Sequence, residues 1–258
     1  MGRSWADNPE RLHQRIKINT NNEKLEGEIE LPTALKSRIE RLNASKSNVN
    51  LISLLCADLI GYQNKDCVDR YLKVVVQAIE ASELLDNEDD GAALVESVAR
   101  NMHKLIAYKD EYEVARLFSL AGIQSELLEV PNSSGKATWH LHPPFLRALG
   151  MNNKLRIPFK IAVPLMNILA KGKVLRGTPF DIFGFAKVRK MERTIRDVYR
   201  KEILAALKVV NKDNYDQVLA LASLPIDVRG FEEIKLRRAE KFLEDLTSIS
   251  KRLFPEKV

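Results

Sequence analysis

The chain has few cysteines and no long apolar stretch. Its 258 residues include only Cys56 and Cys67, which predicts no disulfide framework and fits a reducing cytoplasm. Two thiolates are also too few for an iron–sulfur cluster, because such clusters usually take four. No apolar run approaches the roughly 18 residues that indicate a membrane-spanning helix, and the opening residues lack the apolar region of a signal peptide. We therefore expect a cytoplasmic chain with no membrane segment and no cluster of its own.

The sequence motifs of several enzyme classes are also missing. The chain contains no GxGxxG, GxxxxGK[ST], GxSxG or HExxH, the patterns of dinucleotide sites, P-loops, α/β-hydrolases and zinc proteases. His140 and His142 would share one face of an extended segment, but no Cys, Asp or Glu lies nearby in sequence to complete a metal site. A loop packed by Trp139 and two prolines is the favoured interpretation, so we expect no metal site.

The apolar residues that are present follow helical spacing. They make up 45% of the chain and recur at intervals of three and four, which is typical of amphipathic helices. We expect an acidic turn at 86–90, and Pro164 should kink the helix that contains it. The sequence predicts helices over the ranges 33–43, 47–60, 66–79, 94–106, 158–171, 186–210, 213–224 and 231–253. Asp66 is expected to cap the third of these helices.

These elements predict an all-α fold, a multi-helix bundle in two lobes. The turn-rich stretch PNSSG at 131–135 indicates the boundary. An N-terminal helical lobe would then cover residues 1–131, and a C-terminal helical lobe would cover residues 136–258. The alternation in WHLHPP leaves room for a minor strand pair near 125–142.

Positive charge is concentrated in one part of the chain. Residues 147–201 contain fourteen Lys or Arg and three Asp or Glu, a local charge of +11 within a net charge of +6. Such a segment could meet an anionic partner, and a basic RNA-binding protein is one interpretation. However, the segment lacks interleaved aromatics and any known nucleic-acid motif. Solvated outer faces of helices are the favoured explanation, and we do not expect nucleic acid as a partner.

The loop at 175–193, LRGTPFDIFGFAKVRKMER, has the most unusual composition. Gly177 and Gly184 allow backbone angles that other residues resist. We expect Phe180, Phe183 and Phe185 to be buried, since each carries a large apolar area. The sequence therefore predicts a tight loop anchored by aromatic side chains.

Arginines around this loop form one candidate site. Arg176, Arg189, Arg193 and Arg229 could surround Asp181, or together with Asp181 they could bind an anion such as CoA or a nucleotide, or a partner protein. A structural arginine–aspartate network that holds the loop is the alternative, and it is favoured.

A second dense group of charges lies in YKDEYEVARLF at 108–118. Asp110 or Glu111 could act as a base if burial raised its pKa. The favoured alternative is a structural ion-pair cluster that joins helices and includes Lys109, Asp110, Glu111 and Arg116.

Several of these stretches resemble one known family when they are taken in order. The resemblance is to the C-terminal region of the indolepyruvate ferredoxin oxidoreductase family, the long single-chain 2-oxoacid:ferredoxin oxidoreductases. A weaker match is LIGYQNKDCVDRYLKVV (59–75), and the family's usual proline after Asp181 is replaced here by Ile182. The main matches are VARNMHKLIAYKDEYEVARLF (98–118), HLHPP (140–144), LRGTPFDIFGFAKVRKMER (175–193) and LPIDVRGFEEIK (224–235).

The resemblance implies a role in 2-oxoacid oxidation without catalysis by this chain alone. The family couples thiamine-diphosphate-dependent decarboxylation of a 2-oxoacid to CoA thioester formation and ferredoxin reduction. Thiamine diphosphate, Mg and iron–sulfur clusters are then expected in partner domains or subunits, and none is expected to be bound by this chain alone. We expect a helical accessory region that supports assembly or substrate access. A freestanding anion- or nucleotide-binding module and a basic RNA-binding protein are the alternatives.

Overall fold

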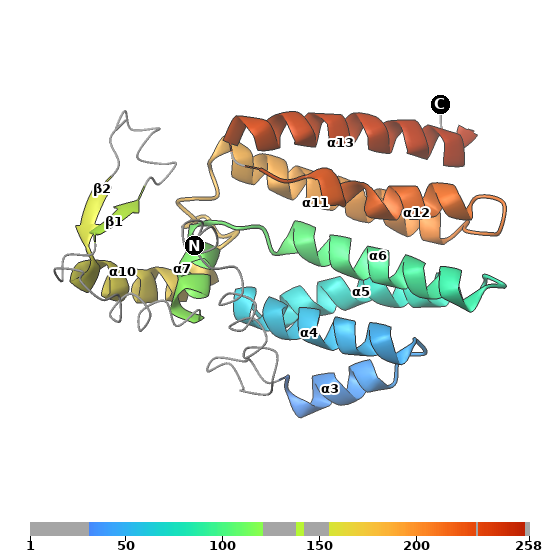
Figure 1. Cartoon of the computed structure of the whole chain (residues 1–258), viewed down its shortest axis with the longest axis horizontal. Helices are drawn as coiled ribbons and strands as arrows, with labels where there is room; N and C mark the ends of the chain where they lie inside the picture. The colour runs from blue at the N-terminus through green and yellow to red at the C-terminus, as the bar shows by residue number, and fades with distance from the viewer. Residues whose placement is uncertain (1–30, 121–137, 142–154, 231, 256–258) are drawn as a thin grey trace, which may run out of the picture. The chain divides into compact units, whose positions relative to one another are not determined.

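The computed structural model describes residues 31–120, 138–141, 155–230 and 232–255. Most of them lie in helices, and the predicted all-α class is confirmed. Figure 1 shows the main helices lying side by side as a bundle. These helices are α3 (Thr33–Glu40), α4 (Lys46–Tyr62), α5 (Lys65–Ser82), α6 (Glu88–Ile106), α11 (Lys187–Leu207), α12 (Tyr215–Ser223) and α13 (Glu232–Leu253).

One apolar core runs through this bundle. On α5, Val68, Leu72, Val75 and Ile79 are buried at the spacing of a single helix face, and the other helices bury similar stripes. The core cluster takes residues from α4, α5 and α6 and also from α11, α12 and α13. Helices from both sides of the predicted boundary therefore share one core, while the boundary itself, 131–136, lies outside the described residues.

Two helices begin earlier than predicted: α5 begins at Lys65 instead of 66, and α6 begins at Glu88 instead of 94. The cap of α5 is Asn64, whose side chain accepts a hydrogen bond from the Cys67 N–H, whereas Asp66 lies inside the first turn. Only the first two residues of the predicted acidic turn at 86–90 lie between helices, because α6 begins at Glu88 and has Asn87 as its cap. Carboxylates in the first turn of a helix are stabilised by the positive end of the helix dipole, which explains why the acids are there.

A second, smaller apolar cluster forms away from the main core. It joins α7 (Glu111–Leu120) to α10 (Phe159–Lys171) through Ala115, Phe118 and Met166. The helix predicted at 158–171 is confirmed, and it contains Pro164. No helix among the described residues combines the length and apolar character that crossing a membrane requires.

A strand pair precedes α10. β1 (Thr138–Leu141) pairs antiparallel with β2 (Leu155–Pro158), and Thr138 lies opposite Pro158. The predicted strand pair near 125–142 included β1 but not its partner, since β2 lies later in the chain. Residues 125–137 and 142 lie outside the described part. His142 is outside it too.

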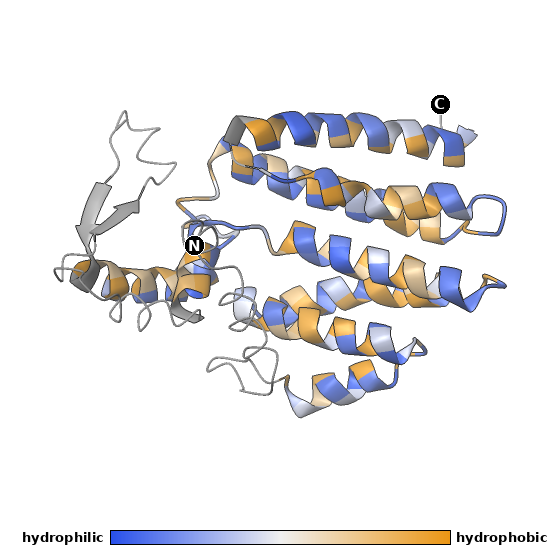
Figure 2. Cartoon of the chain, viewed as in Figure 1, coloured by the Kyte–Doolittle hydropathy of each residue, from blue (hydrophilic) through white to orange (hydrophobic). Residues whose placement is uncertain are grey.

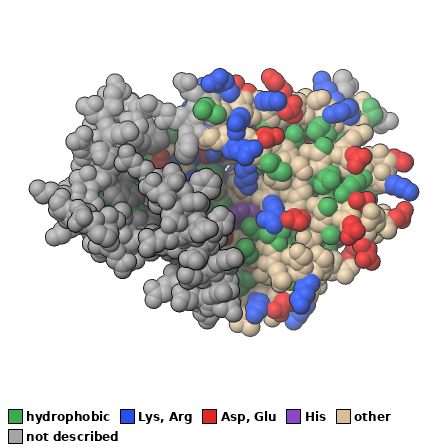
Figure 3. All heavy atoms as spheres, in the orientation of Figure 1, with side chains coloured by type: hydrophobic (Ala, Val, Ile, Leu, Met, Phe, Trp, Pro, Cys, Tyr) green, Lys and Arg blue, Asp and Glu red, His purple; other side chains and the backbone are tan. Residues whose placement is uncertain are grey.

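Charged side chains of both signs are interspersed over the bundle on the face shown in Figure 3. This is the usual arrangement on a solvated helical surface.

Candidate functional site

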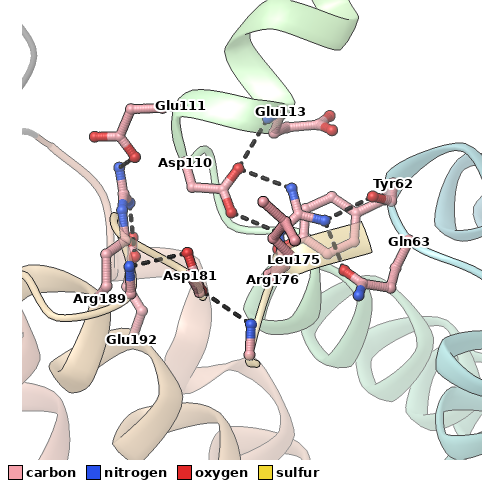
Figure 4. A network of polar contacts seen from close by, with 12 residues as sticks. Tyr62, Gln63, Asp110, Glu111, Glu113, Leu175, Arg176, Asp181, Arg189 and Glu192 are labelled. Carbon is pink, nitrogen blue, oxygen red and sulfur yellow. Dashed lines mark hydrogen bonds and ion pairs between the residues drawn. The ribbon is translucent and has the colours of Figure 1, made fainter. Parts of the chain in front are cut away.

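The centre of the candidate site is a buried ion pair between Arg176 and Asp110 (Figure 4). The Arg176 Nε lies 2.5 Å from Asp110 Oδ2, and Arg176 Nη2 lies 2.8 Å from Asp110 Oδ1. This is the two-bond fork geometry in which a guanidinium holds a carboxylate most strongly. Asp110 Oδ1 also accepts a hydrogen bond from the Glu113 N–H, which caps the first turn of α7. One carboxylate therefore starts a helix and anchors the loop at 176.

The same arginine also binds the end of α4. Arg176 Nη1 donates to the Tyr62 carbonyl oxygen at 2.6 Å and to Gln63 Oε1 at 2.8 Å, and its guanidinium carbon lies 3.7 Å from the centre of the Tyr62 ring. Lys173 donates to the Gly61 carbonyl oxygen at 2.6 Å. The last carbonyls of a helix lack partners within the helix and carry partial negative charge, so two cations stabilise the end of α4.

The loop after Arg176 is closed by Asp181. Its Oδ2 accepts from the Gly177 N–H and its Oδ1 from the Gly184 N–H, at 2.9 and 3.0 Å. Gly177 has a φ of +78°, a conformation that disfavours any side chain. Gly184 is required for a different reason, because a Cβ there would lie 2.5 Å from Asp181 Oδ2. The predicted tight loop is thus confirmed, although backbone N–H groups hold its carboxylate instead of arginines.

The prediction that all three loop phenylalanines are buried was wrong. Phe183 is buried and meets Tyr112 edge to face at 5.0 Å, whereas Phe180 and Phe185 are 74% and 65% exposed. The contact with Tyr112 of α7 thus uses one of the three rings. Burial and the nearby Asp181 raise the pKa of Tyr112 to about 12.

A second group of ion pairs lies at the start of α11. Arg189 donates to Glu192 Oε2 at 2.7 Å and reaches Glu111 Oε2 at 3.5 Å. Lys235 of α13 also donates to Glu192. Burial raises the pKa of Glu111, although Arg189 opposes that shift. Together these pairs tie α7, α11 and α13.

A third group links α4, α6 and α7. Arg116 makes two bonds to Glu113, at 2.8 and 2.7 Å, and one to Asp58 at 2.6 Å. His103 Nε2 lies 2.9 Å from Asp58 Oδ2. The hydrogen bond with His103, together with Arg116, holds the pKa of Asp58 below its ordinary value despite partial burial.

We call the three groups of contacts described above, taken together, the junction. The predicted ion-pair cluster is largely brought together in it. Asp110, Glu111 and Arg116 lie within it, although each pairs with a residue far away in sequence, and Lys109 is exposed. The four arginines proposed for an anion site have separate partners. Arg193 donates to the Gly184 carbonyl oxygen, Arg229 lies on an exposed turn 3.7 Å from Asp227, and Arg176 and Arg189 are buried against carboxylates. Anion binding by this set remains a prediction.

Several members of the junction were not predicted from the sequence as site residues. Tyr62 and Gln63 lie in the weaker of the matched stretches, and the end of a helix beside Gly61 was their only signal. The other members lie far apart in sequence, on elements whose packing no local pattern reveals. These are Asp58, His103, Glu113, Lys173, Glu192 and Lys235. Among the described residues, no three His, Cys, Asp or Glu side chains lie where they could hold a metal ion.

A family model matches residues 49–248, which is most of the chain. The chain belongs to the family of unknown function DUF6537. No curated protein and no solved structure matches it. The matched part contains every residue of the junction described above.

Proposed function

We propose that this DUF6537 chain is the non-catalytic helical accessory part of a thiamine-diphosphate-dependent 2-oxoacid:ferredoxin oxidoreductase. Its role is to support assembly or substrate access. Thiamine diphosphate, Mg and iron–sulfur clusters belong to partner domains or subunits in this proposal. The resemblance of its ordered motifs to the indolepyruvate ferredoxin oxidoreductase family supplies the reaction class.

One observation supports an accessory role: four matched stretches that are distant in sequence meet in a single junction. Residues 59–75 supply Tyr62, residues 98–118 supply Asp110, and residues 175–193 supply Arg176. Residues 224–235 join them twice, since Lys104 donates to the carbonyl oxygens of Pro225 and Ile226 and Lys235 binds Glu192. The matched stretches therefore contact one another and together fix how the helices pack.

The contacts of the two candidate bases favour the same role. Asp110 accepts two bonds from Arg176 and one from the Glu113 N–H, so both of its oxygens are taken up by contacts that hold α7 and the loop. Glu111 faces Arg189, which is itself shared with Glu192. Both carboxylates are placed to hold helices in position.

The test is to purify the chain from its native cells, as the cell makes it, alone or within a longer polypeptide. The preparation should contain thiamine diphosphate, show an iron–sulfur spectrum and reduce viologen with a 2-oxoacid and CoA. The 258-residue chain expressed by itself should bind neither cofactor. A native preparation without this activity would contradict the proposal, and so would thiamine diphosphate bound to the isolated chain.

A further inference from the structure

Exposed apolar side chains are concentrated in one stretch of the chain. Of the fourteen large hydrophobic side chains that are exposed among the described residues, eight lie between residues 161 and 185. Scattered single exposures are normal on a protein surface, but a concentration of this kind marks an interaction site. The eight are Ile161, Leu165, Ile168, Val174, Leu175, Phe180, Ile182 and Phe185.

Helix α10 contributes to this stretch because it is apolar on two faces. Ala162 and Met166 are buried, and the second of them contacts α7. On another face, Ile161, Leu165 and Ile168 follow the spacing i, i+4, i+7 and are 60%, 42% and 68% exposed. Figure 2 shows how much of the described part of α10 is hydrophobic. A helix that is apolar around most of its circumference is normally buried on all sides, but the part of the chain that the structure describes leaves this face of α10 exposed.

The charges around the stretch are nearly all positive. Lys171, Lys187 and Lys190 are exposed and lie within it or just after it. The three acids of the basic segment do not balance them, because Asp181 and Glu192 are buried and used internally and Asp197 pairs with Arg196. The exposed side chains of this stretch and of the residues just after it are therefore mainly apolar or cationic.

We propose that residues 161–185 dock into an apolar cleft with an acidic rim on the thiamine-diphosphate- or cluster-bearing part of the oxidoreductase. This inference rests on the proposed function and adds the surface through which the accessory part is held. Charge complementarity selects an acidic rim, since Lys171, Lys187 and Lys190 would steer and orient such a partner. Exposed aromatic side chains such as Phe180 and Phe185 are suited to fill its cleft.

Two other occupants fit the surface less well. A second copy of the chain would place the same lysines against one another, and like charges repel. An anionic lipid surface attracts amphipathic helices with one charged face, whereas α10 packs an apolar face on α7. The loop that carries Phe180 and Phe185 is also fixed by Asp181 and Arg176. A fixed shape favours a shaped protein cleft, because little ordering is needed on binding.

The experiment is site-specific photo-crosslinking in native cells. Benzoylphenylalanine replaces Phe185, and in a matched control it replaces Leu84, which is 67% exposed at a distant position. We expect adducts from position 185 to a segment of the cofactor-bearing part, whether in the same polypeptide or another, and none from position 84. Phe180→Ser should lower the adduct yield about tenfold or more, as the loss of an aromatic hot spot does, and the control Leu54→Ser should not.

The remaining outcomes separate this inference from the proposed function. Native material that has the oxidoreductase activity but gives no such adduct from position 185 overturns the docking inference and leaves the proposed function standing. Adducts to lipid, to a second copy or to a protein without the cofactor motifs overturn it as well. Native material without the activity overturns the proposed function, and the docking inference falls with it. An unchanged thermal melting curve for Phe180→Ser shows that lost crosslinking reflects docking and not unfolding.

Discussion

At the residue scale, the junction depends on a few charged groups whose partners are fixed. Arg176 is 6% exposed and Asp110 is 3% exposed at the side chain. Removing one member of a buried pair leaves an uncompensated charge in a region of low dielectric, which costs far more than the pair contributes.

Arg176→Met should therefore lower the free energy of unfolding by about 3–5 kcal/mol. The methionine keeps much of the side-chain length but leaves Asp110 unpaired. Urea unfolding followed by circular dichroism measures the loss. Arg229→Met, at a side chain that is 67% exposed, should change the free energy by no more than about 0.5 kcal/mol. A loss of less than about 1 kcal/mol at Arg176 contradicts the structural role.

Gly184→Ala should destabilise the chain by about 1–3 kcal/mol, because the new methyl group meets the Asp181 carboxylate. In an Asp181→Ala background the obstacle is gone, so the cost of Gly184→Ala should fall by at least about 1 kcal/mol. Gly177→Ala serves as the matched control. Its cost arises from a positive φ with open space around it, and that backbone strain is present in either background.

Asp58 gives the junction a pH dependence. Its pKa is lowered in the folded chain by the hydrogen bond with His103 and by Arg116. A lowered carboxyl pKa contributes stability above the unfolded pKa of about 3.9, and this contribution disappears as pH falls through the folded pKa. Asp58→Asn should cost about 1 kcal/mol at pH 7 after allowance for partial exposure, and less at pH 3.

The control for Asp58→Asn is the same substitution at an aspartate of similar exposure that is also paired with an arginine. Asp69 is also 36% exposed, but its partner Arg38 is half exposed, so Asp69→Asn should cost less at pH 7 than Asp58→Asn. Unfolding curves at pH 7, 5 and 3 decide the matter. An Asp58→Asn cost that stays constant over this range would falsify the linkage.

At the scale of elements, most helices could be predicted because a 3.6-residue apolar period is a local property. Helix ends were harder, since Asn64 and Asp66 are both good caps and only the backbone geometry chooses between them. The acidic run at 86–90 was predicted as a turn from its charge, whereas Glu88, Asp89 and Asp90 form the first turn of α6. The exposure of Phe180 and Phe185 could not be predicted, because it depends on which side of the loop packs against the neighbouring helix.

The pairing of Arg176 with Asp110 was equally invisible in the sequence. The partners lie 66 residues apart, and Asp181, five residues from Arg176, was the nearer and more obvious choice. Asp181 instead accepts hydrogen bonds from backbone N–H groups. Every loop has such groups, so the residue types do not indicate which of them a carboxylate will bind. The charged residues could thus be found from the sequence, while their partners required the packing of α4, α7 and the loop.

Asn64→Ala tests the corrected start of α5. Loss of the side-chain cap should lower the free energy of unfolding by about 1 kcal/mol. Asn50→Ala, at an exposed position inside α4, should have no cost, because alanine is the better helix former. Equal effects at the two asparagines in thermal or urea unfolding would rule out the cap.

At the scale of the whole molecule, the buried junction and the apolar stretch 161–185 belong to one arrangement. Arg176, Lys173 and Asp181 fix the loop to α4 and α7, and that loop presents Phe180 and Phe185 outward. Buried charges thus hold an exposed apolar loop in one shape. A loop that is already fixed is well suited to dock against a partner. The same charges bind groups inside the chain, and in the proposed accessory role they take part in no chemical step.

The most direct test of this assignment is turnover per assembled complex for Glu111→Gln. Glu111 has a raised pKa and is the best-placed candidate for a base, so it is the residue most able to contradict the account. Viologen reduction by the native 2-oxoacid preparation, divided by its bound thiamine diphosphate, should stay within about twofold of the unmodified value. A fall of about 100-fold or more in an intact complex, as the loss of a general base produces, would show that this chain takes part in the chemistry.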